Sequence, residues 1–341
     1  MTIAKGKPAI TDGTTQFFNV TYEGNGKGQR VGKFLPFSDN GTVSQSCLFN
    51  DGNNEHLHKT PGSDGNRRTW TWSAWVKRVK SGQGYMFMYS DASANSEVIQ
   101  FDSNERLQYY VLISSSYQIN YISNRTFESS AKWYHIVVRK DTTQSGASDR
   151  VRIYVDGDQI TSWNTATQPS QNDEGFLNKS GVKHALGNFD NASYDDAMGH
   201  MAEVNFADGT SYGPDTFGVT DTSTGRWIPK SLGSISYGTH GYRMTFANSA
   251  GQTIGDDTSG QGNDYTVVNV GADQIRLDSP TQNFTNMGGD DTGGFTKAEG
   301  NLNITSPGSG QYEQVVGQQE FGVATGKWYW EVRVYNKGKT Q

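Results

Sequence analysis

The chain has 341 residues, a formal net charge of -6, 12% aromatic residues and 41 glycines against 8 prolines. This length suits one large all-β unit or two domains, and the acidic balance argues against a nucleic-acid partner, which would need a basic patch. We expect neither a signal peptide nor a membrane span, because no long apolar run occurs, and the single cysteine, Cys47, excludes an intrachain disulfide and suits synthesis in a reducing cytoplasm.

Residues 1–43 are polar and rich in glycine, with two short candidate strands at 15–22 and 29–37. Two isolated strands cannot build a core of their own. We therefore predict an N-terminal arm that attaches the protein to another chain. A flexible leader is the alternative.

From residue 44 onward, short candidate strands follow one another between turns rich in Gly, Asn, Asp and Ser. They lie at 46–49, 70–79, 84–89, 97–102, 106–113, 117–122, 133–139 and 150–160. The last is interrupted by Asp156-Gly157, a strong signal for a hairpin turn. No run of ten residues keeps a helical period, so we predict an all-β, antiparallel two-sheet sandwich with almost no helix.

The strand near residue 70 shows the clearest alternation. Trp70, Trp72 and Val76 lie on one face, and polar residues occupy most of the other. Trp75 breaks the polar face, so we expect apolar partners on both sides of the strand. We predict one core that contains most of the following residues: Trp70, Trp72, Val76, Trp133, Ile136, Val138, Ile153, Val155, Val204 and Phe206.

Several of these strands together resemble laminin-G-like (concanavalin A-like) jelly-roll domains of structural proteins from marine tailed bacteriophages. The resemblance lies in the order of Phe49-Asn50-Asp51-Gly52, the tryptophan strand at 70–78, Trp133-Tyr134-His135-Ile136-Val137-Val138, Ile153-Tyr154-Val155-Asp156-Gly157 and Gly199-His200-Met201-Ala202-Glu203-Val204-Asn205-Phe206. It implies a jelly-roll sandwich over residues 44–213.

The remaining sequence divides into two segments. Residues 214–290 read as a loop-rich bridge with strands at 242–247 and 265–269. The bridge is similar to the tract after the jelly roll in cyanophage and pelagiphage tail-fibre-like proteins, and this resemblance is the most specific one in the chain. It extends from Phe217-Gly218-Val219-Thr220-Asp221 through Asp278-Ser279-Pro280-Thr281-Gln282-Asn283-Phe284. In residues 291–341, the alternating strand at 326–334 resembles the opening strand of SPRY domains, which implies a β-sandwich that continues beyond residue 341. The alternative is that this strand completes another element.

Catalytic patterns are absent from the sequence. Glycosidases of the concanavalin A-like fold carry carboxylates spaced as Glu-x-Asp-x-x-Glu along one strand, and no such run occurs here. No Gly-x-Ser-x-Gly elbow occurs, and the six histidines are scattered, with only His56 and His58 spaced to face one way on a strand. We predict that the protein is not an enzyme.

Oxygen ligands for calcium are concentrated in one loop. Candidate Ca²⁺ ligands there are Asn188, Asp190, Asn191, Asp195 and Asp196. A weaker candidate is Asp256-Asp257 with Asp264. The alternative is that Asp and Asn are simply the residues that turns prefer.

Candidate glycan contacts are aromatic side chains on strands and loops, because sugars stack on aromatic faces. The candidates are Tyr109, Tyr110, Tyr117, Tyr121 and Trp163. Core packing explains strand aromatics equally well, and the sequence does not separate the two roles.

The resemblance implies a virion structural protein made in the host cytoplasm, a tail fibre or fibre-associated protein that mediates assembly and binds host-surface glycans. Its expected partners are other virion proteins, host glycans and copies of itself, with a homotrimer favoured because fibres are usually trimeric. Two alternatives stay open. One is a capsid decoration or head-fibre protein without a receptor role, anchored by residues 1–43, and the other is a carbohydrate-active enzyme such as a glycan depolymerase.

Overall fold

The structure is a computed structural model that describes residues 20–21, 30–31, 41–50, 54–91, 94–188, 199–222, 224–247, 251–288, 295–306 and 317–318. Helical turns in these ranges are short 3-10 segments, η1 (Ala147–Asp149), η3 (Pro214–Thr216) and η4 (Ala272–Gln274). The prediction of an all-β chain with almost no helix is confirmed. Within the same ranges, no helix has the length and apolar character that a membrane span requires.

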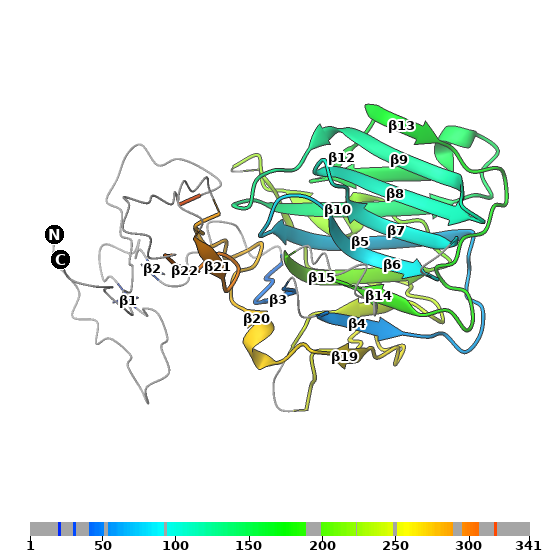
Figure 1. Ribbon diagram of the computed structural model, residues 1–341. Coiled ribbons are helices and arrows are strands. Elements are labelled where there is room, and N and C mark those ends of the chain that lie inside the picture. The colour runs from blue at the N-terminus through cyan, green and yellow to red at the C-terminus, as the bar shows by residue number, and fades with distance from the viewer. Residues whose placement is uncertain are drawn as a thin grey trace.

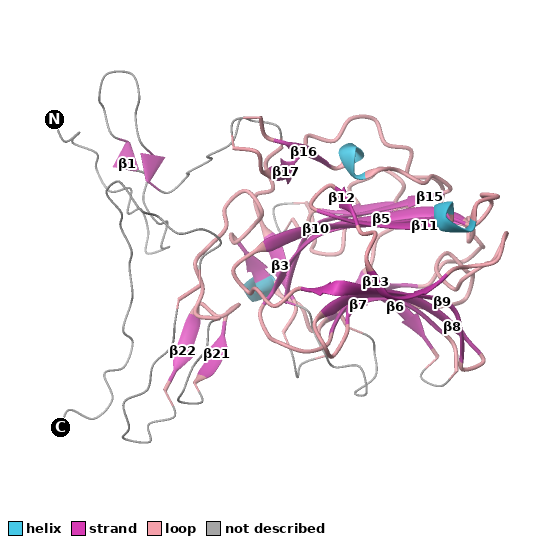
Figure 2. Cartoon of the chain, turned by 90° about the horizontal axis from the view of Figure 1, so that it is seen from above, coloured by secondary structure: helices cyan, strands magenta, loops and turns pink. Residues whose placement is uncertain are grey.

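Two eight-stranded antiparallel sheets stack face to face (Figures 1 and 2). The first sheet has the order β12 (Asp158–Gln159), β11 (Val151–Val155), β10 (Trp133–Asp141), β5 (Thr69–Arg78), β15 (Gly199–Asp208), β3 (Ser46–Leu48) and β20 (Ile275–Arg276), with β18 (Tyr242–Met244) also paired to β15. The second sheet has the order β13 (Trp163–Thr167), β9 (Ser116–Thr126), β8 (Arg106–Ile113), β7 (Ser96–Phe101), β6 (Gly84–Ser90), β14 (His184–Leu186), β4 (His56–Lys59) and β19 (Thr266–Val268).

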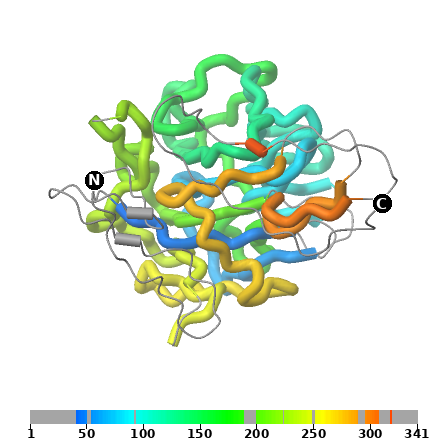
Figure 3. The backbone as a smooth tube through the Cα atoms, turned by 90° about the vertical axis from the view of Figure 1, so that its left-hand side faces the viewer, coloured from blue at the N-terminus to red at the C-terminus, as the bar shows by residue number. Residues whose placement is uncertain are grey.

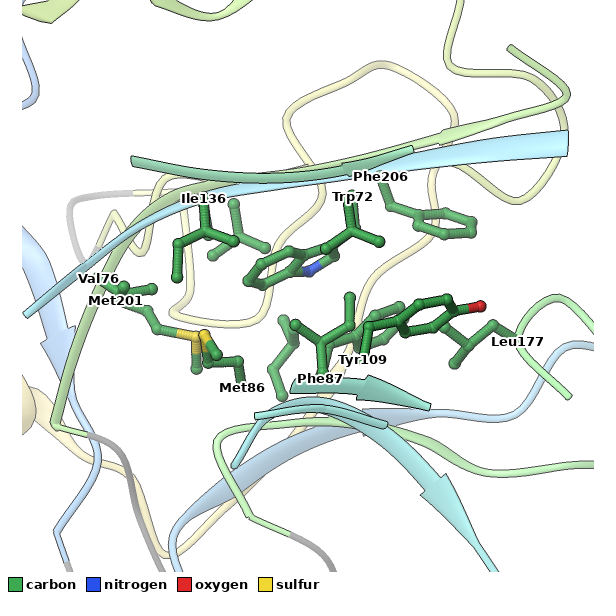
Figure 4. Close-up of a cluster of buried hydrophobic side chains, with 14 of the residues drawn as sticks. Trp72, Val76, Met86, Phe87, Tyr109, Ile136, Leu177, Met201 and Phe206 are labelled. Atoms are coloured by element: carbon green, nitrogen blue, oxygen red, sulfur yellow. The ribbon is translucent and has the colours of Figure 1, made fainter. Parts of the chain in front are cut away.

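The main core lies between the two sheets, and β5 shows how the sequence specifies it. Alternate residues of a strand face opposite sides, so Trp70, Trp72, Ala74 and Val76 all enter the core. Trp72 stacks on Phe87 of the opposite sheet with ring centroids 6.3 Å apart (Figure 4). Of the ten residues predicted for one core, all but Trp133 belong to this cluster.

Trp133 is the exception because it has the opposite parity on β10. Its strand neighbours Ile136 and Val138 face the main core, whereas Trp133 faces outward. There it forms a second cluster with Val43, Trp75, Ala202 and the half-buried Trp227. The prediction that Trp75 meets apolar partners on the outer face is therefore confirmed, as is the prediction that most of the ten residues share one core.

Two segments cover the outer face of the first sheet. One is the hairpin of β16 (Gly218–Thr220) and β17 (Trp227–Pro229), which is paired in antiparallel fashion. The other is the segment 278–284, which we call the clasp. Phe217, next to the hairpin, packs on Val137 and Tyr154 of the sheet.

The segment predicted as a bridge supplies strands to both sheets. Three strands come from residues after 213: β18 pairs with β15, β20 with β3, and β19 with β4. In Figure 3 the gold and orange end of the described chain runs across one end of the sandwich. The boundary predicted at residue 213 therefore cuts through the sandwich.

Two small hairpins complete the described chain. The strands expected in the N-terminal arm appear as β1 (Val20–Thr21) and β2 (Arg30–Val31), which pair with each other. Near the other end, β21 (Thr296–Ala298) pairs with β22 (Asn303–Thr305). The SPRY-like strand expected at 326–334 lies outside the described residues.

Candidate functional site

The aromatic residues predicted to contact a glycan do not form one surface. Tyr109 and Tyr110 are neighbours on β8, so their side chains face opposite sides of the sheet. Tyr109 is fully buried, its hydroxyl donates to Glu97 at 2.7 Å, and burial raises its pKa well above the ordinary value. Tyr110 instead contacts the exposed Tyr117, with ring centroids 5.6 Å apart.

Tyr121 and Trp163 form a second, separate pair. Their ring centroids are 5.0 Å apart, and both pack against the main core. Tyr121 is almost fully buried. Together with Tyr109 it belongs to the core, the alternative that the sequence had left open.

Most of the predicted calcium ligands lie outside the described residues. Asn188 is described and buried, but Asp190, Asn191, Asp195 and Asp196 are not described. The described ranges contain no group of three or more His, Cys, Asp or Glu side chains that could hold a metal ion. The Ca²⁺ site stays a prediction.

The weaker calcium candidate builds a turn. Asp257 accepts the backbone N–H groups of Arg243, Ser259 and Asn263 at 2.8–2.9 Å. Asp264 in turn accepts the backbone N–H of Asp257 at 2.8 Å. These carboxylates therefore stabilise the turn by accepting hydrogen bonds from its backbone, the usual role of Asp in turns.

A cleft of about 370 Å³ opens on the outer face of the first sheet. Its walls come from the start of β10, the turn between β11 and β12, the β17 strand and Pro280 of the clasp. Three tryptophans line it: Trp75 and Trp133, which are nearly buried, and Trp227, which is half-buried. This concentration of indole rings makes the cleft the strongest candidate site in the described chain.

The side chain of His135 lies between two of these tryptophans. Its ring centroid is 4.8 Å from that of Trp75 and 6.0 Å from that of Trp227, with both ring pairs stacked. An indole N–H can only donate, so Nδ1 of His135 accepts from Nε1 of Trp227 at 3.0 Å. The imidazole proton is therefore on Nε2, which donates to Oγ of Ser73 at 2.9 Å.

Burial keeps this imidazole neutral. It lowers the pKa of His135 to about 3. A neutral ring can accept from Trp227 and donate to Ser73 at once, whereas a protonated ring could not accept. The orientation of Trp227 is therefore fixed throughout the physiological pH range.

Glycines leave the space that Trp227 occupies. A Cβ at Gly157 would lie 2.6 Å from the indole, and one at Gly218 would also clash with it. Gly157 has a φ of +88°, a conformation that favours glycine, in the turn that the Asp-Gly signal predicted. Both glycines thus leave room for the Trp227 indole.

The clasp holds Trp133. Its indole Nε1 donates to Oδ1 of Asp278 at 2.9 Å, and the other carboxylate oxygen accepts from Nζ of Lys77 at 2.7 Å. Both charged side chains are fully buried. The ammonium also donates to Oδ1 of Asn283 and to the carbonyl of Phe284, each at 2.8 Å, so its three donors are all used.

The acidic residues of the cleft are not arranged for acid–base catalysis. Asp156 accepts the backbone N–H of His135 at 2.9 Å and pairs with Nζ of Lys132 at 2.8 Å. Both of its oxygens are therefore engaged. Asp158 lies on the exposed β12 strand.

The sequence pointed to this cleft only in part. Trp227 follows a turn and lies in a three-residue strand, too short to show alternation, and Trp133 looked like an ordinary core residue. The one signal was Trp75, which interrupts the polar face of its strand.

Residues 51–210, just under half of the chain, match the laminin G family model described as the concanavalin A-like lectin/glucanases superfamily. None of the curated proteins compared with the chain matches it.

Similar solved structures include a heptameric SAP-like pentraxin from Limulus polyphemus, with 12% identity, 50% of this chain and 79% of the pentraxin covered, and a TM-score of 0.34. Domains LG4-5 of the mouse laminin alpha1 chain have 13% identity, 58% and 47% coverage and a TM-score of 0.33. The enzymatically active domain of bacteriophage CBA120 tailspike protein 2 has 13% identity, 47% and 25% coverage and a TM-score of 0.33. The chain thus spans less than half the length of the laminin and tailspike chains, and no activity is carried over from them.

The family match rests on the same strands that build the two sheets. Residues 51–210 include β5 to β15 and therefore most of both sheets. This region has the antiparallel two-sheet sandwich of the concanavalin A-like fold.

Proposed function

We propose that the protein is a non-catalytic, glycan-binding structural protein of a tailed-phage virion, a tail fibre or fibre-associated protein, and that it binds host-surface glycans in the tryptophan cleft. The observation that carries the binding role is Trp227, a half-buried indole held rigidly at the wall of a cleft. The virion role rests on the sequence resemblance described above.

A pre-organised indole favours sugar binding for two reasons. The apolar face of a sugar ring packs on an aromatic ring, and the neighbouring charged groups can bond its hydroxyls. The ring is already fixed by His135, Gly157 and Gly218, so little conformational entropy is lost on binding.

The absence of catalysis is part of the proposal. Hydrolysis of a glycosidic bond by two carboxylates needs one that can donate a proton and one that is free to act as base or nucleophile. Asp156 is engaged at both oxygens, which leaves Asp158 alone among the acids that line the cleft. Incubation with host polysaccharide should therefore release no oligosaccharide.

The test compares Trp227→Ala with Tyr89→Ala, which removes a half-buried aromatic side chain from the second sheet. Calorimetric titration with purified host-surface polysaccharide should show binding by the wild type and by Tyr89→Ala. Loss of a central aromatic contact costs about 2 kcal/mol or more, so Trp227→Ala should bind roughly 30-fold more weakly. Equal binding by the two variants, or no binding by the wild type, would refute the proposal for this cleft.

Separate measurements test the proposed assembly of the protein in the virion. We propose a homotrimer, attached through residues 1–43 to other virion proteins. Mass measurement in solution should give three times the chain mass, and labelling in intact virions should place the protein on the tail. A clean monomer, or a label confined to the capsid, would contradict the fibre.

A further inference from the structure

The charges around the cleft point to the class of sugar that it takes, an inference that rests on the proposed function. Three cationic side chains line the cleft, Arg125, Lys132 and Arg226, against two carboxylates, Asp156 and Asp158. The cleft is thus positive by one charge, although the chain as a whole carries -6. A positive cleft in an acidic protein favours an anionic ligand.

One ion pair in the cleft wall is closed on itself. Lys132 and Asp156 pair at 2.8 Å, and the second oxygen of Asp156 accepts a backbone N–H. Their charges therefore cancel within the wall. Arg125 lies outside this pair.

Arg125 is placed as a free cation at the rim. Its guanidinium carbon lies 4.7 Å from the ring centroid of Phe127 and 5.8 Å from that of Tyr134. These rings hold the group by cation–π contact, and it forms no hydrogen bond or ion pair with any residue in the described part of the chain. A planar guanidinium with its donors unused matches a carboxylate, which it can bind through two parallel hydrogen bonds.

We infer that the cleft binds an acidic saccharide with one carboxylate on the recognised sugar, its ring against Trp227 and its carboxylate on Arg125. Asp158 adds a negative charge to the cleft and disfavours a polyanion. The same residue can accept a sugar hydroxyl on the other side of the ring.

The test uses pairs of oligosaccharides that differ only in charge: galacturonate, glucuronate and sialic acid oligosaccharides, each with its methyl ester. The wild type should bind at least one acid about tenfold more tightly than its ester, as expected for a charge-assisted contact. Raising the salt concentration should weaken binding of the acid and leave binding of the ester unchanged.

Three variants localise the effect. Arg125→Gln should abolish the preference for the acid, Asp158→Asn should strengthen binding of the acid, and Arg152→Gln should change neither, because Arg152 pairs with Asp149 away from the cleft. Melting curves confirm that each variant is folded.

The outcomes separate this inference from the proposed function. If acid and ester bind equally, if the ester binds better, or if no member of the panel binds, the inference of an acidic ligand is wrong. Host polysaccharide binding that Trp227→Ala abolishes would in each case still support a glycan-binding cleft. If Trp227→Ala bound host polysaccharide as tightly as the wild type, both the acidic ligand and the glycan-binding cleft would be wrong.

Discussion

Trp72 shows how much of the sandwich depends on one side chain. It is fully buried, stacks on Phe87 and lies on β5, the strand with the clearest alternation. The second sheet contributes the partner ring, so this single contact joins the two layers across the core (Figure 4).

Truncation of Trp72 should destabilise the domain severely. Trp72→Ala leaves a large cavity between the sheets, and such truncations cost about 3–5 kcal/mol, against a typical domain stability of about 5–15 kcal/mol. Urea unfolding measures the loss, with Trp163→Ala as a less buried control. An unchanged midpoint for Trp72→Ala would mean that β5 does not pack as described.

Three buried histidines couple stability to pH. Burial is the main cause in each case, and it lowers the pKa of His135 to about 3 and those of His184 and His200 to about 4. The unfolded chain takes up these protons near the ordinary pKa of about 6.5, while the folded chain stays neutral. Their contribution to stability is therefore complete above that pH and is lost as pH falls toward 4.

Each histidine should contribute a slope of up to about 1.4 kcal/mol per pH unit between pH 6 and 4.5. The measurement is the urea midpoint as a function of pH. In His184→Asn the slope should fall by the equivalent of about one proton. A midpoint that stays constant from pH 7 to 5 would show that these rings are not neutral and buried.

At the scale of strands, the bounds of two long strands were predicted closely, whereas some short strands were missed. The alternation in 69–78 and 106–113 extends over eight to ten residues, and the predicted strands agree with β5 and β8 within one residue. By contrast, β14 and β17 have three residues each, which is too few for a period of two to be visible. Their pairing is decided by partners far away in the sequence, and the cleft depends on one of them.

The clasp is an element without regular structure that nevertheless fixes the first sheet. Its Asp278 bonds Lys77 of β5 and Trp133 of β10, and its backbone carbonyl accepts from Ser46 of β3 at 2.6 Å. Thr281 accepts the backbone N–H of Val43 at 3.2 Å and donates to its carbonyl at 2.6 Å. The clasp thus forms a polar network that ties three strands together.

Breaking this network on one side should be costly. Asp278→Asn leaves the Lys77 ammonium buried without its counter-charge, and loss of one partner of a buried pair costs about 3–5 kcal/mol. Lys77→Met combined with Asp278→Asn should cost less than the sum of the single changes, since neither buried charge is then left unpaired. Urea unfolding of the four proteins in this cycle measures the coupling, and strictly additive effects would argue against a buried pair.

At the scale of the molecule, the sandwich extends beyond the region that resembles the laminin G family. The sequence placed its end near residue 213, because the later strands are short and separated by long loops. Strands β18, β19 and β20 nevertheless complete both sheets. The alternation within single strands was enough to predict an all-β sandwich. Where the sandwich ends depends on pairing between distant strands, which the sequence of one strand does not show.

A chain limited to residues 41–213 should therefore not fold cooperatively. It lacks three sheet strands, the clasp and the β17 wall of the cleft, and it removes the clasp partners of the Lys77 ammonium. A chain of residues 41–288 retains these elements and should unfold in one cooperative transition. Thermal unfolding and limited proteolysis compare the two, and equal cooperativity would show that the later strands are dispensable.

The clasp also constrains how the protein emerges from the ribosome. Ser46 and Asp278 are 232 residues apart, so at about 5–20 residues per second the first strand of the sheet waits roughly 10–50 s for its clasp. The β16–β17 hairpin is made before the clasp, so the outer face of the sheet is covered in two stages. The cover over Trp133 is therefore completed only late in synthesis.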